Sequence, residues 1–282
     1  MTQKHIDFHT HTHYSDGIGT PEDNIKLARF NGLDYIAITD HDNMAGVAEA
    51  IEAGKKWGIH VIPGIEISTE DYHILGLNIN PADKEFIRKS AEFQRRVCAS
   101  RVELLAEQGI PITMEKVERA NPDARLGKMN IFYTIAQDAE CQRYFFKNDI
   151  YSLSYDGYSE LLKKSKRAVS DKETEVSPKK AIDFIHEAGG IAIIAHPFKD
   201  IENLEELDVL IDQGLDGLEI QPNFNGQNEQ CRKYALEHNL LVTYGSDWHG
   251  GLFGRPMLWS KGENVLSEKL AEALGLEVLQ NA

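Results

Sequence analysis

The sequence has no apolar run long enough to cross a bilayer as a helix, which takes about 18 to 20 residues. Basic residues are also in deficit: 30 Lys and Arg stand against 45 Asp and Glu, giving the 282-residue chain a formal charge of -15. This balance argues against a general binder of nucleic acids or membrane surfaces, because both are anionic. The negative charge does not exclude small anionic ligands, because bound divalent cations can reverse the electric field locally.

Cysteine is scarce and scattered. The three cysteines, Cys98, Cys141 and Cys231, include no C-x-x-C pair, so we expect no disulfide framework and a reducing compartment. The N-terminal residues lead straight into a polar segment without a signal-peptide pattern. We therefore expect a cytoplasmic location and no membrane partner. Nothing in the sequence indicates the oligomeric state.

Short apolar runs alternate with helical periodicity at both ends of the chain. Thr20 and Pro21 have the residue types of a helix N-cap and first helical position, and Gly32 is a plausible end for that helix. Alternating strands and helices predict an α/β fold with a parallel sheet or barrel. The expected strands are 5–8, 35–38, 60–62, 73–75, 191–194, 217–220 and 241–244. The other expected helices are 43–57, 178–188, 203–213 and 227–238.

The middle of the chain has a different pattern. Residues 82–170 show helical periodicity, and the stretch 125–172 holds nine Lys and Arg against six Asp and Glu. We interpret residues 99–173 as a small helical insertion that covers the active site, inside a catalytic barrel formed by 1–98 and 174–282. The alternative, which composition alone favours, is an ordinary solvated helical stretch.

Several of the eleven histidines come directly after predicted strands: His9 and His11, His41, His196 and His249. Carboxylates accompany them at Asp7, Asp16, Asp40, Asp42, Glu66 and Asp247. The carboxyl ends of parallel strands meet on one face, so these side chains are expected to lie close together. Imidazoles and carboxylates are the ligands that a site for several divalent metal ions requires. One H-x-H pair alone would be weak support, but five separate segments place a histidine or an acid at or after the end of a predicted strand, and together they predict a metal site.

The same segments resemble the PHP (polymerase and histidinol phosphatase) phosphoesterases. The matching motifs are Asp7-Phe8-His9-Thr10-His11 with Ser15-Asp16-Gly17, Ile38-Thr39-Asp40-His41-Asp42, Pro63-Gly64-Ile65-Glu66-Ile67-Ser68, His73-Ile74-Leu75-Gly76-Leu77, Ala195-His196-Pro197 and Gly245-Ser246-Asp247-Trp248-His249. They follow the order of the family over nearly the whole chain. The resemblance implies a distorted (β/α)7 barrel and two or three divalent metal ions, usually manganese, zinc or iron.

Carried over position by position, the resemblance implies a ligand set of His9, His11, Asp16, His41, Glu66, His73, His196, Asp247 and His249. Glu66 would bridge two ions, and Glu66 and Asp247 would hold the metal-bound hydroxide that attacks the substrate. Asp7, Asp40 and Asp42 would orient metal-bound imidazoles. For Asp7 and Asp40 the alternative is capping of nearby backbone, and Asp42 could also serve as a helix N-cap.

The resemblance extends to a branch with a helical insertion, which contains nucleoside 3′,5′-bisphosphate phosphatases and 5′–3′ exoribonucleases. Lys199 follows the His-Pro pair where many relatives have an arginine that meets phosphate. Lys128 lies in Gly-Lys-Met-Asn, where relatives commonly have Gly-Arg/Lys-Pro-His. Lys still supplies charge but lacks the bidentate guanidinium. With Arg125, Arg255 and His13, these residues are the expected substrate contacts.

The expected function is a metal-dependent phosphatase that hydrolyses a phosphate monoester of a nucleotide or similar small molecule. The sequence contains neither a G-x-S-x-G motif nor a cysteine in a His-rich motif, so it gives no sign of a covalent protein nucleophile. Short oligonucleotides would suit the site, whereas the acidic remainder of the chain disfavours a long duplex. The alternatives are 5′–3′ exoribonuclease activity on short RNA, a histidinol-phosphate-type phosphatase, an amidohydrolase, and a non-catalytic metal-binding module.

Overall fold

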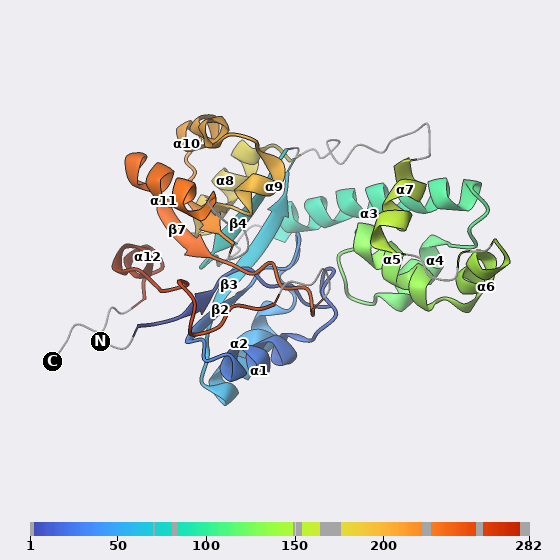
Figure 1. The fold of residues 1–282 in the computed structure, drawn as a ribbon, viewed down its shortest axis with the longest axis horizontal. Coiled ribbons are helices and arrows are strands. Elements are labelled where there is room, and N and C mark those ends of the chain that lie inside the picture. The colour runs from blue at the N-terminus through green and yellow to red at the C-terminus, as the bar shows by residue number, and fades with distance from the viewer. Residues whose placement is uncertain are drawn as a thin grey trace.

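The computed structural model describes residues 3–69, 71–80, 84–148, 150, 154–163, 176–221, 227–251 and 256–276. Seven strands form one sheet whose spatial order is the sequence order. The two ends of the sheet approach each other, because the Phe8 amide donates to the Tyr244 carbonyl at 2.8 Å and the His11 amide to the Trp248 carbonyl at 2.8 Å. The sheet is thus a nearly closed barrel (Figure 1), which confirms the predicted distorted α/β barrel.

The strands are β1 (Ile6–Asp7), β2 (Tyr35–Ile38), β3 (His60–Ser68), β4 (His73–Leu77), β5 (Ile191–Ile194), β6 (Gly217–Ile220) and β7 (Leu241–Tyr244). The prediction of a parallel arrangement is wrong for one strand: β4 pairs antiparallel with both β3 and β5. Strand β3 continues to Ser68, and only residues 69–72 connect it to β4, which is too short for a parallel crossover. All other pairs are parallel.

Helices cover the outside of the barrel. They are α1 (Pro21–Phe30), α2 (Val47–Trp57), α8 (Pro178–Glu187), α9 (Pro197–Asp200), η1 (Leu204–Leu207), α10 (Asp208–Asp212), α11 (Gln227–Glu237) and α12 (Glu268–Ala273). Thr20 caps α1 as predicted, because its hydroxyl accepts from the Asp23 amide while the Asp23 carboxylate accepts from the Thr20 amide.

Two helix predictions differ from the structure. The expected helix 203–213 is divided into η1 and α10. Helix α2 begins at Val47 rather than at residue 43, and Asp42 does not cap it. Asp42 has a φ of 47° and its carboxylate accepts from the Ser68 amide at 3.2 Å. After β2 the chain therefore first contacts the end of β3 through Asp42, and helix α2 begins only at Val47.

The described residues between 84 and 163 are helical or irregular, as predicted, and form α3 (Lys84–Glu107), α4 (Met114–Ala120), α5 (Lys128–Gln137), α6 (Ala139–Lys147) and α7 (Tyr155–Lys163). Helix α3 passes residue 98 without a break and runs from the barrel to the group of α4 to α7 (Figure 1). This group has its own apolar core, with buried residues that include Cys98, Leu105, Ile131, Ile135 and Tyr158.

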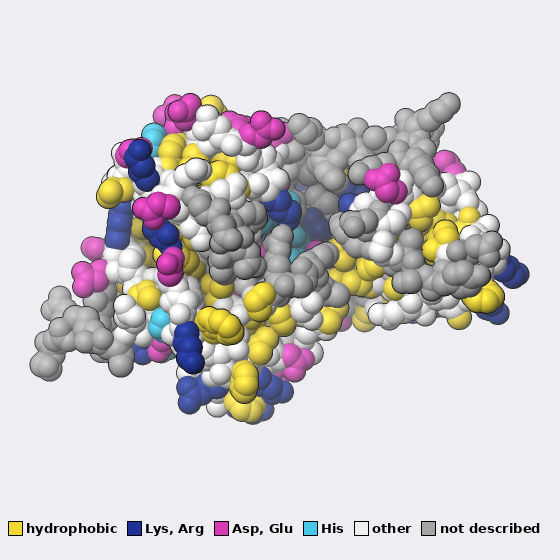
Figure 2. Space-filling model, in the orientation of Figure 1, with side chains coloured by type: hydrophobic (Ala, Val, Ile, Leu, Met, Phe, Trp, Pro, Cys, Tyr) yellow, Lys and Arg dark blue, Asp and Glu magenta, His cyan; other side chains and the backbone are white. Residues whose placement is uncertain are grey.

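The barrel core consists of the β-branched residues that predict the strands. Ile36, Ile38, Ile193 and Ile194 are fully buried. Each contributes about 1.5–3 kcal/mol relative to an exposed side chain. Ile193 and Ile194 are consecutive and point to opposite faces of the sheet, and both are buried because helices cover the outside of the barrel. In the part of the chain that the structure describes, no helix is long and apolar enough to cross a membrane. Figure 2 shows a hollow between the barrel and the helical group, with histidine and basic side chains inside it.

Candidate metal centre

All nine residues expected as metal ligands lie at one end of the barrel. His9 and His11 follow β1, and Asp16 lies on the loop that comes next. The other ligands lie at or beyond the neighbouring strand ends: His41 after β2, Glu66 in β3, His73 at the start of β4, His196 after β5, and Asp247 and His249 after β7. His73 reaches this end because β4 is antiparallel and pairs it with Ser68. Eight of the nine residues are buried, and His73 is half-buried.

Glu66 is the centre of the group. Five imidazole nitrogens lie 2.9–3.2 Å from its two carboxylate oxygens. Those near Oε2 are His9 Nε2, His11 Nε2 and His41 Nδ1, and those near Oε1 are His73 Nδ1 and His196 Nε2. One carboxylate that faces two separate sets of imidazoles has the arrangement needed to bridge two ions.

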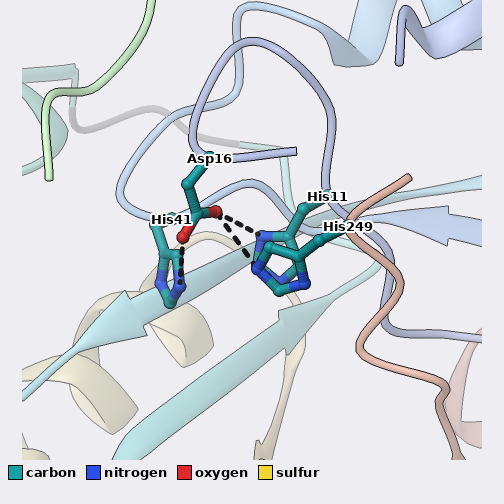
Figure 3. A group of neighbouring side chains, drawn as sticks. All are labelled: His11, Asp16, His41 and His249. Atoms are coloured by element: carbon teal, nitrogen blue, oxygen red, sulfur yellow. Dashed lines mark ion pairs between the residues drawn. The ribbon is translucent and has the colours of Figure 1, made fainter. Parts of the chain in front are cut away.

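Asp16 is the centre of a second group of imidazoles (Figure 3). Its Oδ1 lies 3.3 Å from His249 Nε2 and 3.6 Å from His11 Nδ1, and its Oδ2 lies 3.9 Å from His41 Nε2. Asp247 forms a third, with Oδ1 3.5 Å from the Nε2 atom of His9 and 3.4 Å from that of His11. Eight of the nine residues therefore form three overlapping groups: His11, Asp16, His41 and His249; His9, His11, Glu66 and Asp247; and His41, Glu66 and His73. His196 adjoins them through its Nε2, which lies 3.1 Å from Glu66 Oε1.

The contacts inside these groups fit bound cations. The Nε2 atoms of His9 and His11 face each other at 3.0 Å in a fully buried setting. His41 Nδ1 and Glu66 Oε2 are also buried and lie 3.1 Å apart, but neither atom has a partner in hydrogen-bond geometry within the described residues. Buried polar atoms without partners are costly unless they bind a ligand. Imidazole nitrogens together with carboxylate oxygens suit manganese, zinc or iron.

The carboxylates of the site are held in their charged form. Burial alone would raise the pKa of Glu66, but the imidazoles of His41, His9 and His73 outweigh it and hold that pKa well below its usual range. The pKa values of Asp16 and Asp247 are likewise far below the usual range, because neighbouring imidazoles outweigh burial. Three buried negative charges at neutral pH favour multivalent cations.

The imidazoles titrate in opposite directions. Burial lowers the pKa of His41 well below its usual value, which keeps this ring neutral. Burial also acts to lower the pKa of His11, but the neighbouring carboxylates of Asp247 and Glu66 outweigh it and raise that pKa to about 10. A metal ion needs the neutral ring, so His41 is ready to bind whereas His11 must first lose a proton.

Two of the carboxylates expected to orient imidazoles have other partners. Asp7 accepts from the Ser246 amide and hydroxyl at 2.9 and 2.6 Å and from the Leu258 amide at 3.0 Å. Asp40 accepts from the Thr12 amide at 2.8 Å and from the Ser15 hydroxyl at 2.6 Å. These contacts match the alternative in which both residues hold the backbone of the loops that carry the ligands.

In His9 and His196, the ring nitrogen that does not face Glu66 is Nδ1. Each of these Nδ1 atoms lies near a carboxylate that the sequence motifs do not predict, Glu219 for His9 and Asp200 for His196. Glu219 Oε1 lies 2.9 Å from His9 Nδ1, and its Oε2 accepts from the His196 amide at 2.8 Å. Asp200 Oδ2 lies 3.2 Å from His196 Nδ1. The available signals were the acidic residue inside the apolar strand 217–220 and the i,i+4 spacing of His196 and Asp200.

A cavity of about 540 Å³ extends from this centre to the helical group. Its lining includes seven of the nine expected ligands and four cationic side chains: Arg101, Arg125, Lys128 and Lys199. Tyr72, Val97 and Met129 provide apolar surface. Lys199 makes no side-chain hydrogen bond or ion pair with any other described residue, so its charge is available to a ligand.

The other three expected substrate contacts, Arg125, His13 and Arg255, differ from Lys199 and Lys128. In the described part of the chain His13 is not among the cavity-lining residues; its ring packs on Tyr14 with 4.3 Å between the centroids. Arg125 borders the cavity, but its guanidinium is paired with Asp42 at 2.7 Å. Arg255 lies outside the described residues.

An α/β barrel that carries overlapping His–carboxylate groups at the strand ends is the architecture of a metal-dependent hydrolase. Residues 7–188, more than half of the chain, match the PHP domain family, and the chain belongs to that family. Its members are metal-dependent phosphoesterases, and this chain is therefore a hydrolase of phosphate esters.

Three curated relatives match along most of the chain. A phosphoribosyl 1,2-cyclic phosphate 1,2-diphosphodiesterase from Eggerthella lenta is 28% identical over 88% of this chain and 95% of the relative. A 5′–3′ exoribonuclease from Haemophilus influenzae is 33% identical over 88% of this chain and 91% of the relative. A 3′,5′-nucleoside bisphosphate phosphatase from Chromobacterium violaceum is 26% identical over 86% of this chain and 87% of the relative.

A solved structure is similar over its full length. The protein, from Bifidobacterium adolescentis, is named as a metal-dependent phosphoesterase and is 29% identical in sequence. It superposes with a TM-score of 0.80 over 98% of both chains. The similarity therefore includes the helical group as well as the barrel.

Proposed function

We propose that this chain hydrolyses a phosphate monoester of a nucleotide or a similar small molecule. The observation that carries the proposal is the cavity, which joins the nine-residue His–carboxylate cluster to cationic side chains of the helical group. Its volume of about 540 Å³ suits a small ligand rather than a duplex.

Two or three divalent ions, manganese, zinc or iron, would be held by His9, His11, Asp16, His41, Glu66, His73, His196, Asp247 and His249. Such ions, when bound, neutralise the oxygens of a phosphate and lower the pKa of water. Glu66 would bridge two of them, because its two oxygens face different imidazoles. Asp247 would hold the ions near His9 and His11. Glu219 and Asp200 would keep the rings of His9 and His196 in the required orientation.

The cationic residues would bind the substrate. Lys199 lies in α9, three residues after His196, and its ammonium is available to the scissile phosphate. Lys128 begins α5 on the opposite wall of the cavity, and Arg101 comes from α3. Because they belong to separate elements, these side chains can hold an anionic substrate at more than one point while Tyr72, Val97 and Met129 contact its apolar parts.

A second candidate is 5′–3′ exoribonuclease activity on short RNA. The similarity to the Haemophilus influenzae exoribonuclease, which extends over most of both chains, favours it. The same cluster would then act on a diester, and the helical group would hold the second nucleotide. The two functions differ in product: a monoesterase releases inorganic phosphate, and an exoribonuclease releases a nucleotide.

The organisation and location of the chain are part of the same proposal. We treat residues 99–173 as an insertion that covers the site of a barrel formed by 1–98 and 174–282; the separate apolar core of the helical group supports this division. Three buried cysteines without disulfide bonds support a reducing, cytoplasmic location.

The test is product analysis on a panel of phosphate esters with Mn²⁺ and, separately, with a chelator. The panel contains nucleoside monophosphates, nucleoside 3′,5′-bisphosphates, histidinol phosphate and a short 5′-phosphorylated RNA. We expect metal-dependent phosphate release from one class of nucleotide. Release of mononucleotides from the RNA alone would favour the exoribonuclease, and the absence of metal-stimulated turnover on every substrate would contradict the proposal.

A further inference from the structure

Arg125, which precedes α5, binds the barrel instead of pointing its charge freely into the cavity. Its Nη2 donates to Asp42 Oδ2 at 2.7 Å and to Ser68 Oγ at 2.9 Å, and its Nε donates to the same Asp42 oxygen at 3.1 Å. The Asp42 side chain is fully buried, and that of Arg125 is 9% exposed. A charged pair this well shielded from water keeps most of its electrostatic attraction.

Asp42 in turn connects two segments that carry ligands. It directly follows His41, and its amide donates to the carbonyl of Glu66 at 2.9 Å. Its second carboxylate oxygen accepts from the Ser68 amide at 3.2 Å. The carboxylate therefore fixes the end of β2 against the end of β3, where His41 Nδ1 and Glu66 Oε2 lie 3.1 Å apart.

The residues around Arg125 also hold the loop that carries Asp16. The Arg125 amide donates to the carbonyl of Tyr14 at 2.8 Å, and Asn130 Nδ2 donates to the carbonyl of Ser15 at 2.7 Å. The Tyr133 hydroxyl donates to the carbonyl of Asp16 itself at 3.2 Å. One short stretch of the helical group thus contacts the surroundings of three expected ligands.

We infer that Arg125 is a positioning residue that couples the docking of the helical group to metal binding. Through Asp42 it holds the backbone between His41 and Glu66, and its neighbours hold the Asp16 loop. The inference rests on the metal centre proposed above. Coupling of this kind is reciprocal, so bound metal also strengthens the docking of residues 125–133 on the barrel.

The competing role for Arg125 is direct binding of substrate phosphate. That role would require the guanidinium to leave Asp42, and the carboxylate would then be buried without its charge partner, which is strongly destabilising. Lys199 requires no such exchange. The two roles predict different results for Arg125 variants, because a substrate contact affects KM and a positioning residue affects metal affinity.

The experiment measures Mn²⁺ affinity by calorimetry for the wild type, Arg125→Ala, Arg125→Lys and Asp42→Asn. We expect Arg125→Ala to weaken Mn²⁺ binding by about 10-fold or more, as loss of a supporting contact around metal ligands does, and Arg125→Lys to retain part of the affinity. Arg119→Ala, an exposed change on α4, is the matched control and keeps wild-type affinity. The double variant Arg125→Ala/Asp42→Asn loses no more than the larger single loss, because the residues act as a pair.

Hydrogen exchange provides a readout that does not depend on turnover. Mn²⁺ should slow exchange in residues 125–133 of the wild type and have little effect there in Arg125→Ala. Wild-type affinity in both Arg125 variants, with a raised KM, would overturn the inference and assign Arg125 to the substrate. If Arg125→Ala does not fold, Arg125→Lys and Asp42→Asn decide the question in the same way. A wild-type chain that binds none of Mn²⁺, Zn²⁺ and Fe²⁺ would overturn the metal centre, and the inference with it.

Discussion

Glu219 Oε1 lies 2.9 Å from Nδ1 of His9 inside the barrel, and both side chains are fully buried. The second oxygen of Glu219 accepts from the amide of His196 at 2.8 Å. One carboxylate on β6 therefore sets both the ring of His9, which follows β1, and the backbone of His196, which follows β5. The contact to Nδ1 leaves Nε2 of His9 directed toward Glu66 and Asp247, as a metal ligand requires.

The change Glu219→Gln should weaken both metal binding and activity. The amide keeps the shape of the side chain but loses the charge that favours one tautomer of His9. We expect Mn²⁺ affinity and kcat/KM to fall by about 10- to 100-fold. Metal content and steady-state kinetics measure the effect, and Glu229→Gln on the exposed face of α11 is the control. Wild-type metal affinity in Glu219→Gln would show that His9 needs no orienting partner.

Gly245→Ala should disturb the same contact from the other side. A Cβ atom at residue 245 would overlap Glu219 Oε1 and the Cβ of His9, and neither can move within the packed barrel. We expect loss of metal binding together with a lower melting temperature. Gly19→Ala, where the nearest atom is a side-chain oxygen of Asn24 at 3.3 Å, is the matched control. A Gly245→Ala protein that binds Mn²⁺ normally would contradict the arrangement of Glu219 and His9.

The sequence predicts those parts of the fold and site that depend on local periodicity. Short β-branched runs predict the strands, and a histidine or acid directly after a parallel strand is placed at the common end by topology alone. His41 and His249 are examples. His73 reaches the same end for a different reason, since β3 continues to Ser68 and β4 returns antiparallel. Nothing in a short apolar run distinguishes these two directions.

The parts that could not be predicted depend on packing between distant segments. Glu219 lies within the apolar strand 217–220, and only the closed barrel shows that its carboxylate meets His9, 210 residues away. Arg125 and Asp42 are 83 residues apart, and their pairing follows from the docking of the helical group. From the sequence alone, a basic residue in an insertion is equally consistent with binding a substrate phosphate, because composition does not show whether its partner is a phosphate or a carboxylate of the barrel.

Asp247→Ala should abolish turnover while the fold is retained, because it removes a candidate ligand and little apolar packing. Metal ions supply several kcal/mol of transition-state stabilisation, so we expect kcat to fall on the order of 10³-fold. Circular dichroism and metal analysis accompany the kinetics, with Asp212→Ala, an exposed change on α10, as the control. Turnover at the wild-type rate would show that Asp247 holds no catalytic ion.

Lys199→Ala should act on substrate binding. Lys199 lines the cavity and its ammonium makes no hydrogen bond or ion pair with another described residue, so its removal leaves no buried partner unpaired. We expect KM to rise about 10-fold, equivalent to ~1.4 kcal/mol, with kcat changed less. The control is Lys179→Ala on α8. An unchanged KM on the best substrate would remove Lys199 from the phosphate site.

Metal binding should depend on pH through His11. In the metal-free protein, burial acts to lower the pKa of this ring, but the neighbouring carboxylates of Asp247 and Glu66 outweigh it and raise the pKa to about 10. A folded-state pKa above the unfolded value of about 6.5 means that the protonated ring stabilises the metal-free fold fully below that pH. This stabilisation is lost as the pH rises through about 10.

A divalent ion binds only the neutral ring, so it must displace this proton at neutral pH. We therefore expect Mn²⁺ binding to release protons at pH 7 and the apparent affinity to rise with pH, by up to about 10-fold per unit for each proton displaced. Calorimetry in buffers of different ionisation enthalpy counts the released protons directly. Affinity that stays constant from about pH 6.5 to 9 would contradict the protonated state of His11, since a ring that is already neutral has no proton to lose.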